Sequence, residues 1–167
     1  MPTMYDASVP TVTRALTNLI GVLEKGAAYA EAKKIEPAVL IASRLYPDMF
    51  PLSRQVQIAS DVAKIGISRL AQVEPPKYED SEATFPDLVE RARKTIAYLA
   101  TLKPGLFDDG TRMVTFPTQS ESRTWPGSRY LYQRVLPNVF FHCTTAYDLL
   151  RHNGVDIGKG DFLGPLD

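Results

Sequence analysis

Two polar residues, Asn138 and His142, lie at the edge of an apolar stripe in the predicted helix 137–154. Residues four apart share one face of a helix, so both side chains can point toward the same neighbouring helix. Gln55, on the buried side of another predicted helix, can meet them there. Buried polar groups need partners, so this trio of two amides and one imidazole calls for an explanation. His142 is the one member able to exchange a proton near neutral pH.

The trio has two interpretations, and the sequence leaves both open. In the first, Gln55, Asn138 and His142 bond to one another and fix the register of two helices. In the second, they line a pocket, where they orient a small ligand or polarise a carbonyl group. Trp125 and Tyr130 lie in the long connection before the last helix. They are expected to wall the mouth of that pocket, to form a dimer interface, or simply to pack.

Two further reactive side chains are expected to be structural. Cys143 falls in the middle of the apolar stripe, and a thiol is reactive only where it is exposed and near positive charge. His152 ends the last helix, where a cationic side chain suits the helix dipole. The sequence contains no GxSxG, phosphate-binding glycine loop, CxxC or HExxH, the short motifs that would have indicated a hydrolase, a nucleotide site or a metalloprotease.

The composition is that of an ordinary globular protein and excludes several partners. The chain has 167 residues, 44% of them hydrophobic, and a formal net charge of zero, which argues against nucleic acid or an anionic membrane as partner. A single cysteine excludes an internal disulfide and a cysteine zinc site. No apolar run is long enough to cross a bilayer, and the start of the sequence lacks the pattern of a signal peptide. We therefore expect a soluble, cytoplasmic protein.

Four helical segments carry the candidate residues. The first is expected to begin near Ser8, with Pro10 near its first turn. It is expected to end or bend at Gly26, with 27–34 continuing it after that break. The second spans 51–72 and carries Gln55 on a broad apolar face. Its opposite, solvated face is expected to comprise Arg54, Gln57, Asp61, Lys64 and Ser68.

The third helix is expected to span 85–102, with Thr84 as its cap, and the fourth is the stretch 137–154. Between them, 113–116 and 122–125 can pair as a short hairpin, and the tail from 155 onward is expected to strap the surface. These elements predict one all-α domain over 1–167. The predicted fold is a four-helix up-and-down bundle, with one long crossover and a small hairpin or irregular segment before the last helix.

Several motifs together resemble those of a known superfamily. They are Leu52-x-x-Gln55-Val56, Asn138-x-x-x-His142, and the stretches 150–155, 47–52 and 158–164. On these motifs the chain resembles the DinB/YfiT-like superfamily, in a branch of undefined function. The resemblance implies a four-helix bundle, often a homodimer. It also implies a divalent metal held by three histidines in many members, some of which are thiol transferases or thiol-dependent isomerases.

The chain departs from that pattern at the metal site. Gln55 and Asn138 stand at the positions of two of the three histidines, and only His142 remains. A carboxamide oxygen is a poor ligand for zinc or nickel. The resemblance therefore implies at most a weakly bound divalent metal at His142, and we expect none.

Two functional hypotheses follow. The first is a protein that binds a small molecule, or acts as a thiol-transferase-like enzyme, with a degraded metal site. The second is a non-catalytic, dimeric helical bundle that serves as a binding or stress-associated module. The sequence does not decide whether the protein is an enzyme.

Overall fold

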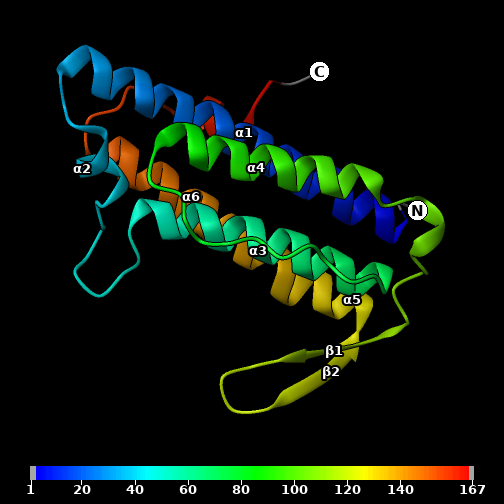
Figure 1. Ribbon diagram of the computed structural model, residues 1–167. Helices are drawn as coiled ribbons and strands as arrows, with labels where there is room; N and C mark the ends of the chain where they lie inside the picture. The colour runs from blue at the N-terminus through cyan, green and yellow to red at the C-terminus, as the bar shows by residue number, and fades with distance from the viewer. Residues whose placement is uncertain (1–2, 166–167) are drawn as a thin grey trace.

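The computed structural model describes residues 3–165, and its main elements are four long helices: α1 (Met4–Lys33), α3 (Leu52–Ala71), α4 (Phe85–Thr101) and α6 (Leu136–His152). Helix α1 packs against α4 and α6, and α3 packs against the same two helices, so the four enclose one core. Figure 1 shows α1 and α4 as a layer over α3 and α6. The predicted all-α four-helix bundle is confirmed.

Shorter elements join the four helices. They are α2 (Pro37–Ile41), a 3-10 turn η1 (Pro104–Leu106), the strands β1 (Met113–Pro117) and β2 (Ser122–Pro126), α5 (Gly127–Tyr130), a π-helical turn η2 (Leu131–Val135), and α7 (Lys159–Leu163). The two strands pair antiparallel, as the predicted hairpin requires. The hairpin lies at the end of the bundle where α6 begins (Figure 1).

The directions of the helices differ from simple alternation at one place. Two contacts give the relative direction of α3 and α4: Asp61 meets Arg91, and seven residues farther along each helix Ser68 meets Tyr98. The two helices are therefore parallel. Parallel neighbours need a connection that returns along the full length of the first helix. The segment 72–84 does this, running outside α3 in an extended conformation (Figure 1). This connection covers one side of α3.

The start of α1 differs from the prediction. The helix begins at Met4, capped by Thr3, whose side chain and that of Asp6 bond reciprocally to each other's backbone N–H groups. Ser8 is therefore inside the helix, where its hydroxyl donates to the carbonyl of Met4 at 2.6 Å. Pro10 also lies inside α1 rather than in its first turn. The helix does not end at Gly26, because α1 continues to Lys33.

The ends of α4 and α6 follow from their sequences. Thr84 caps α4 in a second reciprocal arrangement, with Asp87. Pro137 occupies the first turn of α6. Gly154, beyond the end of α6, adopts a φ of 94°, the left-handed conformation that closes helices.

The expected solvated face of α3 is largely buried, and this prediction is wrong. Gln57, Lys64 and Ser68 are 6%, 3% and 0% exposed. The reason is the returning connection 72–84 together with α4, which cover this side of the helix. The half-exposed face of α3 instead carries Ile58, Val62, Ile65 and Arg69.

The tail straps α1, as predicted, and also contains the short helix α7. Asn18 donates to the carbonyl of Phe162 at 2.9 Å, and Lys25 pairs with Asp161 at 2.6 Å. Among the helices of the described chain, none is both long and apolar enough to cross a bilayer.

Candidate functional site

Helices α3 and α6 bring Gln55 and His142 together. Nδ1 of His142 lies 2.7 Å from Oε1 of Gln55, and the two side chains are buried. Gln55 is in the first turn of α3 and His142 in the second turn of α6. The two helices run antiparallel, because Gly66, farther along α3, lies against Val135, which precedes α6. We call these two residues the imidazole–amide pair.

The hydrogen bonds of Gln55 determine which nitrogen of His142 carries the proton. Nε2 of Gln55 donates to the carbonyl oxygen of Phe50 at 3.0 Å, and a carbonyl can only accept. Oε1 of Gln55 therefore faces the ring and accepts from Nδ1–H. Burial, and to a smaller extent Arg54, lowers the pKa of His142, so the ring is neutral at pH 7. Its Nε2 is then an acceptor for a hydrogen bond or a proton.

Substitution of His142 by alanine is expected to lower the free energy of unfolding by about 1–3 kcal/mol, because Oε1 of Gln55 would stay buried without a donor. Urea denaturation measures the effect. His152→Ala is the control, since this histidine is exposed at the end of α6 and its loss is expected to change stability by less than about 0.5 kcal/mol. Equal stability of parent and His142→Ala would contradict a structural role for the pair.

The other predicted site residues lie apart from the imidazole–amide pair. Asn138 makes no hydrogen bond to the pair within residues 3–165. It lines a cavity of about 200 Å³ together with Tyr130. Trp125 packs edge-on against Phe116, and Phe116 also contacts Tyr130. The five candidates therefore form two groups: the pair, and a crossover group of Asn138, Tyr130 and Trp125.

The donor set at the pair does not fit zinc or nickel. Nε2 of His142 is the one nitrogen ligand that the pair offers, because Nδ1 is bonded to Gln55 and the oxygen of Gln55 is occupied in the same bond. The remaining member, Asn138, offers only a carboxamide, a poor ligand for these metals. Within residues 3–165, no group of three or more His, Cys, Asp or Glu side chains is arranged to hold a metal ion. We therefore derive no chemistry through a metal.

The two residues expected to be structural have the expected surroundings. Cys143 is buried in the core, and burial raises its pKa to about 12. Its thiol is therefore protonated at neutral pH, which makes it a poor nucleophile. His152 is exposed in the last turn of α6.

A buried arginine organises the opposite side of α3. Arg91, on α4, is 1% exposed. Its guanidinium lies 2.9 Å from oxygens of Asp61 on α3 and of Asp80 and Glu82 in the connection 72–84. Gln57 donates to the other oxygen of Glu82 at 2.9 Å. This Arg91 network fastens the connection to both helices.

Tyr78 extends the network by its ring. The Nζ atoms of Lys64 and Lys94 lie 3.8 Å and 4.0 Å from the centre of the ring, within the range of a cation–π contact. Lys64 also pairs with Asp61 at 3.1 Å. The amine of Lys64 is thus buried between an aromatic face and a carboxylate, which accounts for a lysine at a position that is 3% exposed.

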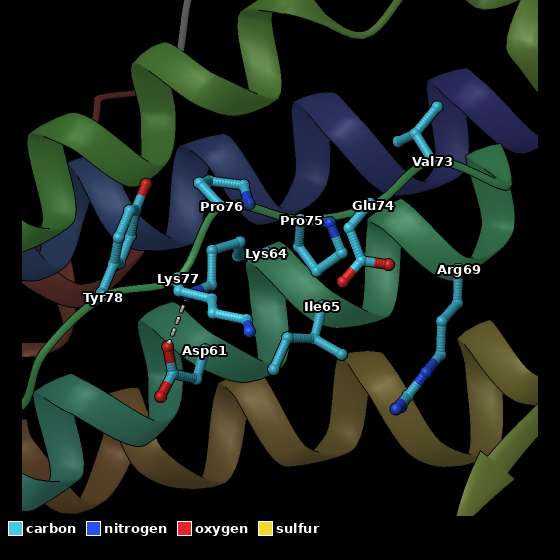
Figure 2. A pocket seen from close by; sticks show the side chains of 10 residues that line it. All are labelled: Asp61, Lys64, Ile65, Arg69, Val73, Glu74, Pro75, Pro76, Lys77 and Tyr78. Atoms are coloured by element: carbon cyan, nitrogen blue, oxygen red, sulfur yellow. Dashed lines mark ion pairs between the residues drawn. The ribbon is translucent and has the colours of Figure 1, made fainter.

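Three residues of α3, spaced four apart, separate two cavities. Asp61, Ile65 and Arg69 form this ridge, which Figure 2 shows as a row along α3 with the connection passing beside it. The connection-side cavity, about 510 Å³, lies between the ridge and residues 73–78. The crossover-side cavity, about 200 Å³, lies between the ridge and the hairpin, η2 and α6; its other lining residues are Val62, Gly66, Pro117, Tyr130, Arg134, Val135 and Asn138.

Sequence analysis missed the ridge and the Arg91 network, although part of the signal was present. Arg91 falls three residues after Leu88 and eight before Leu99, on the apolar stripe of its helix. An arginine at such a position indicates a buried ion pair. For Arg69 and Arg134 no comparable signal exists, because their proximity depends on how α3 meets the crossover.

Comparisons with known proteins agree with this architecture. Residues 4–163 match the family described as "Domain of unknown function (DUF1993)". The crystal structure of a DinB family member protein from Shewanella denitrificans is 41% identical to this chain, with a TM-score of 0.90. The match covers 98% of this chain and 93% of that one. No curated protein matches the sequence.

Proposed function

The chain belongs to the DUF1993 family of DinB-like proteins, and from this premise we propose that it binds a small molecule without using a metal. The observation that carries the proposal is the crossover-side cavity. It collects two residues that the sequence had indicated for a pocket, Asn138 and Tyr130, beside the ridge of α3. The side chain of Asn138 makes no hydrogen bond within the described residues, so its amide is available to a ligand.

The position of the cavity supports the same proposal. It lies where the long connection between α4 and α6 rejoins the bundle, and long connections of this kind tend to be functional. The π-helical turn η2 contributes Arg134 and Val135 to its wall. Single π turns are rare in proteins and occur often at functional sites.

The imidazole–amide pair has a supporting role in this proposal. His142 follows Asn138 by one helical turn, about 6 Å along α6. Its neutral ring, held by Gln55, ties α6 to the first turn of α3 and presents Nε2 as an acceptor. The thiol-transferase chemistry that the superfamily resemblance implies would require a thiol brought by the substrate, because Cys143 is buried and protonated.

A cavity-blocking variant tests the proposal. Ile65 is half-exposed and lines both cavities, so Ile65→Trp is expected to fill them without entering the core. A library of neutral, cationic and anionic metabolites is screened by thermal shift on the parent and on this variant. We expect compounds that raise the melting temperature of the parent and lose that effect in Ile65→Trp.

Ile58→Trp is the matched control, since Ile58 is also half-exposed on α3 but lines neither cavity. It is expected to respond to ligands as the parent does. If no compound of any class stabilises the parent, or if Ile65→Trp responds as well as Ile58→Trp, the cavity is not a binding site.

The second candidate function is a dimeric binding module of the cytoplasm. It is favoured by two exposed aromatic residues at the imidazole–amide pair. Phe50, whose carbonyl oxygen accepts from Gln55, is 54% exposed, and Phe141, whose ring centre lies 5.2 Å from that of His142, is 56% exposed. Exposed aromatic groups of this size often mark interfaces. A failed ligand screen together with a homodimer by light scattering would favour this candidate over the first.

A further inference from the structure

We propose that the crossover-side cavity is an anion subsite, which takes the carboxylate or phosphate group of a small ligand through Arg69 and Arg134. This inference rests on the proposed function, because it names the chemical class of the ligand bound in the same cavity. It depends on the charges of the lining residues and on the donors they leave unused.

The cavity carries two positive charges that are not neutralised. Neither Arg69 nor Arg134 has a carboxylate within ion-pair distance in the part of the chain described. The one acidic residue in the wall, Asp61, is already paired with Lys64 at 3.1 Å and with Arg91 at 2.9 Å. The surplus charge is therefore positive, and a ligand group that complements it is an anion.

The donors of the cavity suit a planar or tetrahedral anion. Arg69 donates from Nη1 to the hydroxyl of Tyr130 at 3.2 Å, which uses an acceptor lone pair of that hydroxyl and leaves its O–H free to donate. The guanidinium carbon of Arg134 lies 5.4 Å from the centre of the Phe116 ring, and its N–H groups make no hydrogen bond within the described residues. With the amide of Asn138, these groups supply several N–H and O–H donors around one space.

The remaining walls are apolar and limit the size of the ligand. Val62, Ile65, Val135 and Pro117 line the same space, so the rest of the ligand is expected to be a short carbon skeleton or a single ring. A volume of about 200 Å³ is smaller than the roughly 300–1,000 Å³ typical of drug-sized ligands. The adjoining connection-side cavity, across the ridge, offers room for a larger substituent.

Binding of three matched probes tests the anion subsite. Benzoate carries a carboxylate, phenyl phosphate a phosphate, and benzamide is the neutral counterpart of benzoate. By isothermal titration at low salt, at least one anion is expected to bind the parent about tenfold or more tightly than benzamide, because hydrogen bonds to charged groups are the stronger ones. The tighter of the two anions identifies the group that the site prefers. Added sodium chloride is expected to weaken that binding.

Substitutions locate the binding. Arg69→Gln and Arg134→Gln are each expected to weaken the anion about tenfold or more, with little effect on benzamide. Arg129→Gln is the matched control: Arg129 is a nearby arginine whose guanidinium lies 4.3 Å over Trp125 and which does not line the cavity. Arg134 is exposed, so its variant is expected to fold even if Arg69→Gln does not.

The outcomes separate this inference from the proposed function. Benzamide binding as tightly as both anions, or anion binding that survives both arginine substitutions, would overturn the anion subsite. If neutral compounds nevertheless bind and Ile65→Trp abolishes their binding, the small-molecule function stands and only the ligand class is wrong. If no compound binds the parent, both proposals fail together.

Discussion

Replacement of Arg91 by leucine is expected to lower the free energy of unfolding by about 3–5 kcal/mol, the cost of removing one partner from a buried ion pair. Arg91 is 1% exposed and lies 2.9 Å from three carboxylates. Without it, Glu82 keeps a negative charge at a position where its side chain is 8% exposed. Asp61 and Asp80 are more exposed and recover part of their hydration, so Glu82 carries most of the loss.

Urea denaturation of Arg91→Leu at pH 7 measures this loss. Arg93→Leu is the control on the same helix: Arg93 pairs with Glu24, both side chains are more than half exposed, and surface pairs contribute only about 0–1 kcal/mol. The connection 72–84 is expected to become sensitive to proteolysis in Arg91→Leu and not in Arg93→Leu. A loss below 1 kcal/mol for Arg91→Leu would mean that the connection is held mainly by its other contacts.

The same network gives the variant a characteristic pH dependence. Burial acts to raise the pKa of Glu82, but hydrogen bonds and charge from Arg91, with Gln57, lower it below its ordinary value of 4.5. A carboxyl group with a lowered pKa stabilises the folded state above the unfolded pKa, and this contribution is lost as the pH falls through the folded pKa. The stability difference between parent and Arg91→Leu is therefore expected to be largest near pH 7 and to shrink below about pH 4.

The fold could be predicted from local signals that act within one helix. Apolar spacing located α3, α4 and α6, and the cap at Thr84 and the left-handed Gly154 fixed two of their ends. The predicted start of α1 was wrong, although the signal for the true start is also local. Thr3 and Asp6 form the same reciprocal cap as Thr84 and Asp87. Ser8 and Pro10 also suit the first turn of a helix, so they predict a later start.

The candidate site could be predicted only in part, because its parts depend on how elements far apart in the sequence meet. The antiparallel contact of α3 with α6 was sufficient to bring Gln55 to His142. The place of Asn138 was not predictable in the same way, since a side chain on the flank of a helix faces whichever neighbour the crossover supplies. The parallel course of α3 and α4 had a similar effect: it requires the returning connection that buries Lys64.

At Gly66, in the wall of the crossover-side cavity, α3 and η2 approach each other closely. A Cβ atom at this position would lie 2.8 Å from both methyl groups of Val135, on the π-helical turn η2. Valine is stiff about χ1, so the methyl groups cannot turn away, and the two elements would have to separate. Gly66→Leu is therefore expected to lower the free energy of unfolding by about 3 kcal/mol or more, at the upper end of overpacking effects.

A second glycine separates this packing effect from helix propensity. Gly21 lies inside α1 with no heavy atom within 4 Å of a built Cβ, so Gly21→Leu is expected to stabilise the protein by up to about 1 kcal/mol, the gain from replacing glycine in a helix. Denaturation of both variants under the same conditions measures the two effects with opposite signs. If Gly66→Leu were also stabilising, α3 and η2 would be able to move apart without loss. The crossover-side cavity would then have a mobile wall rather than the fixed one on which the anion subsite depends.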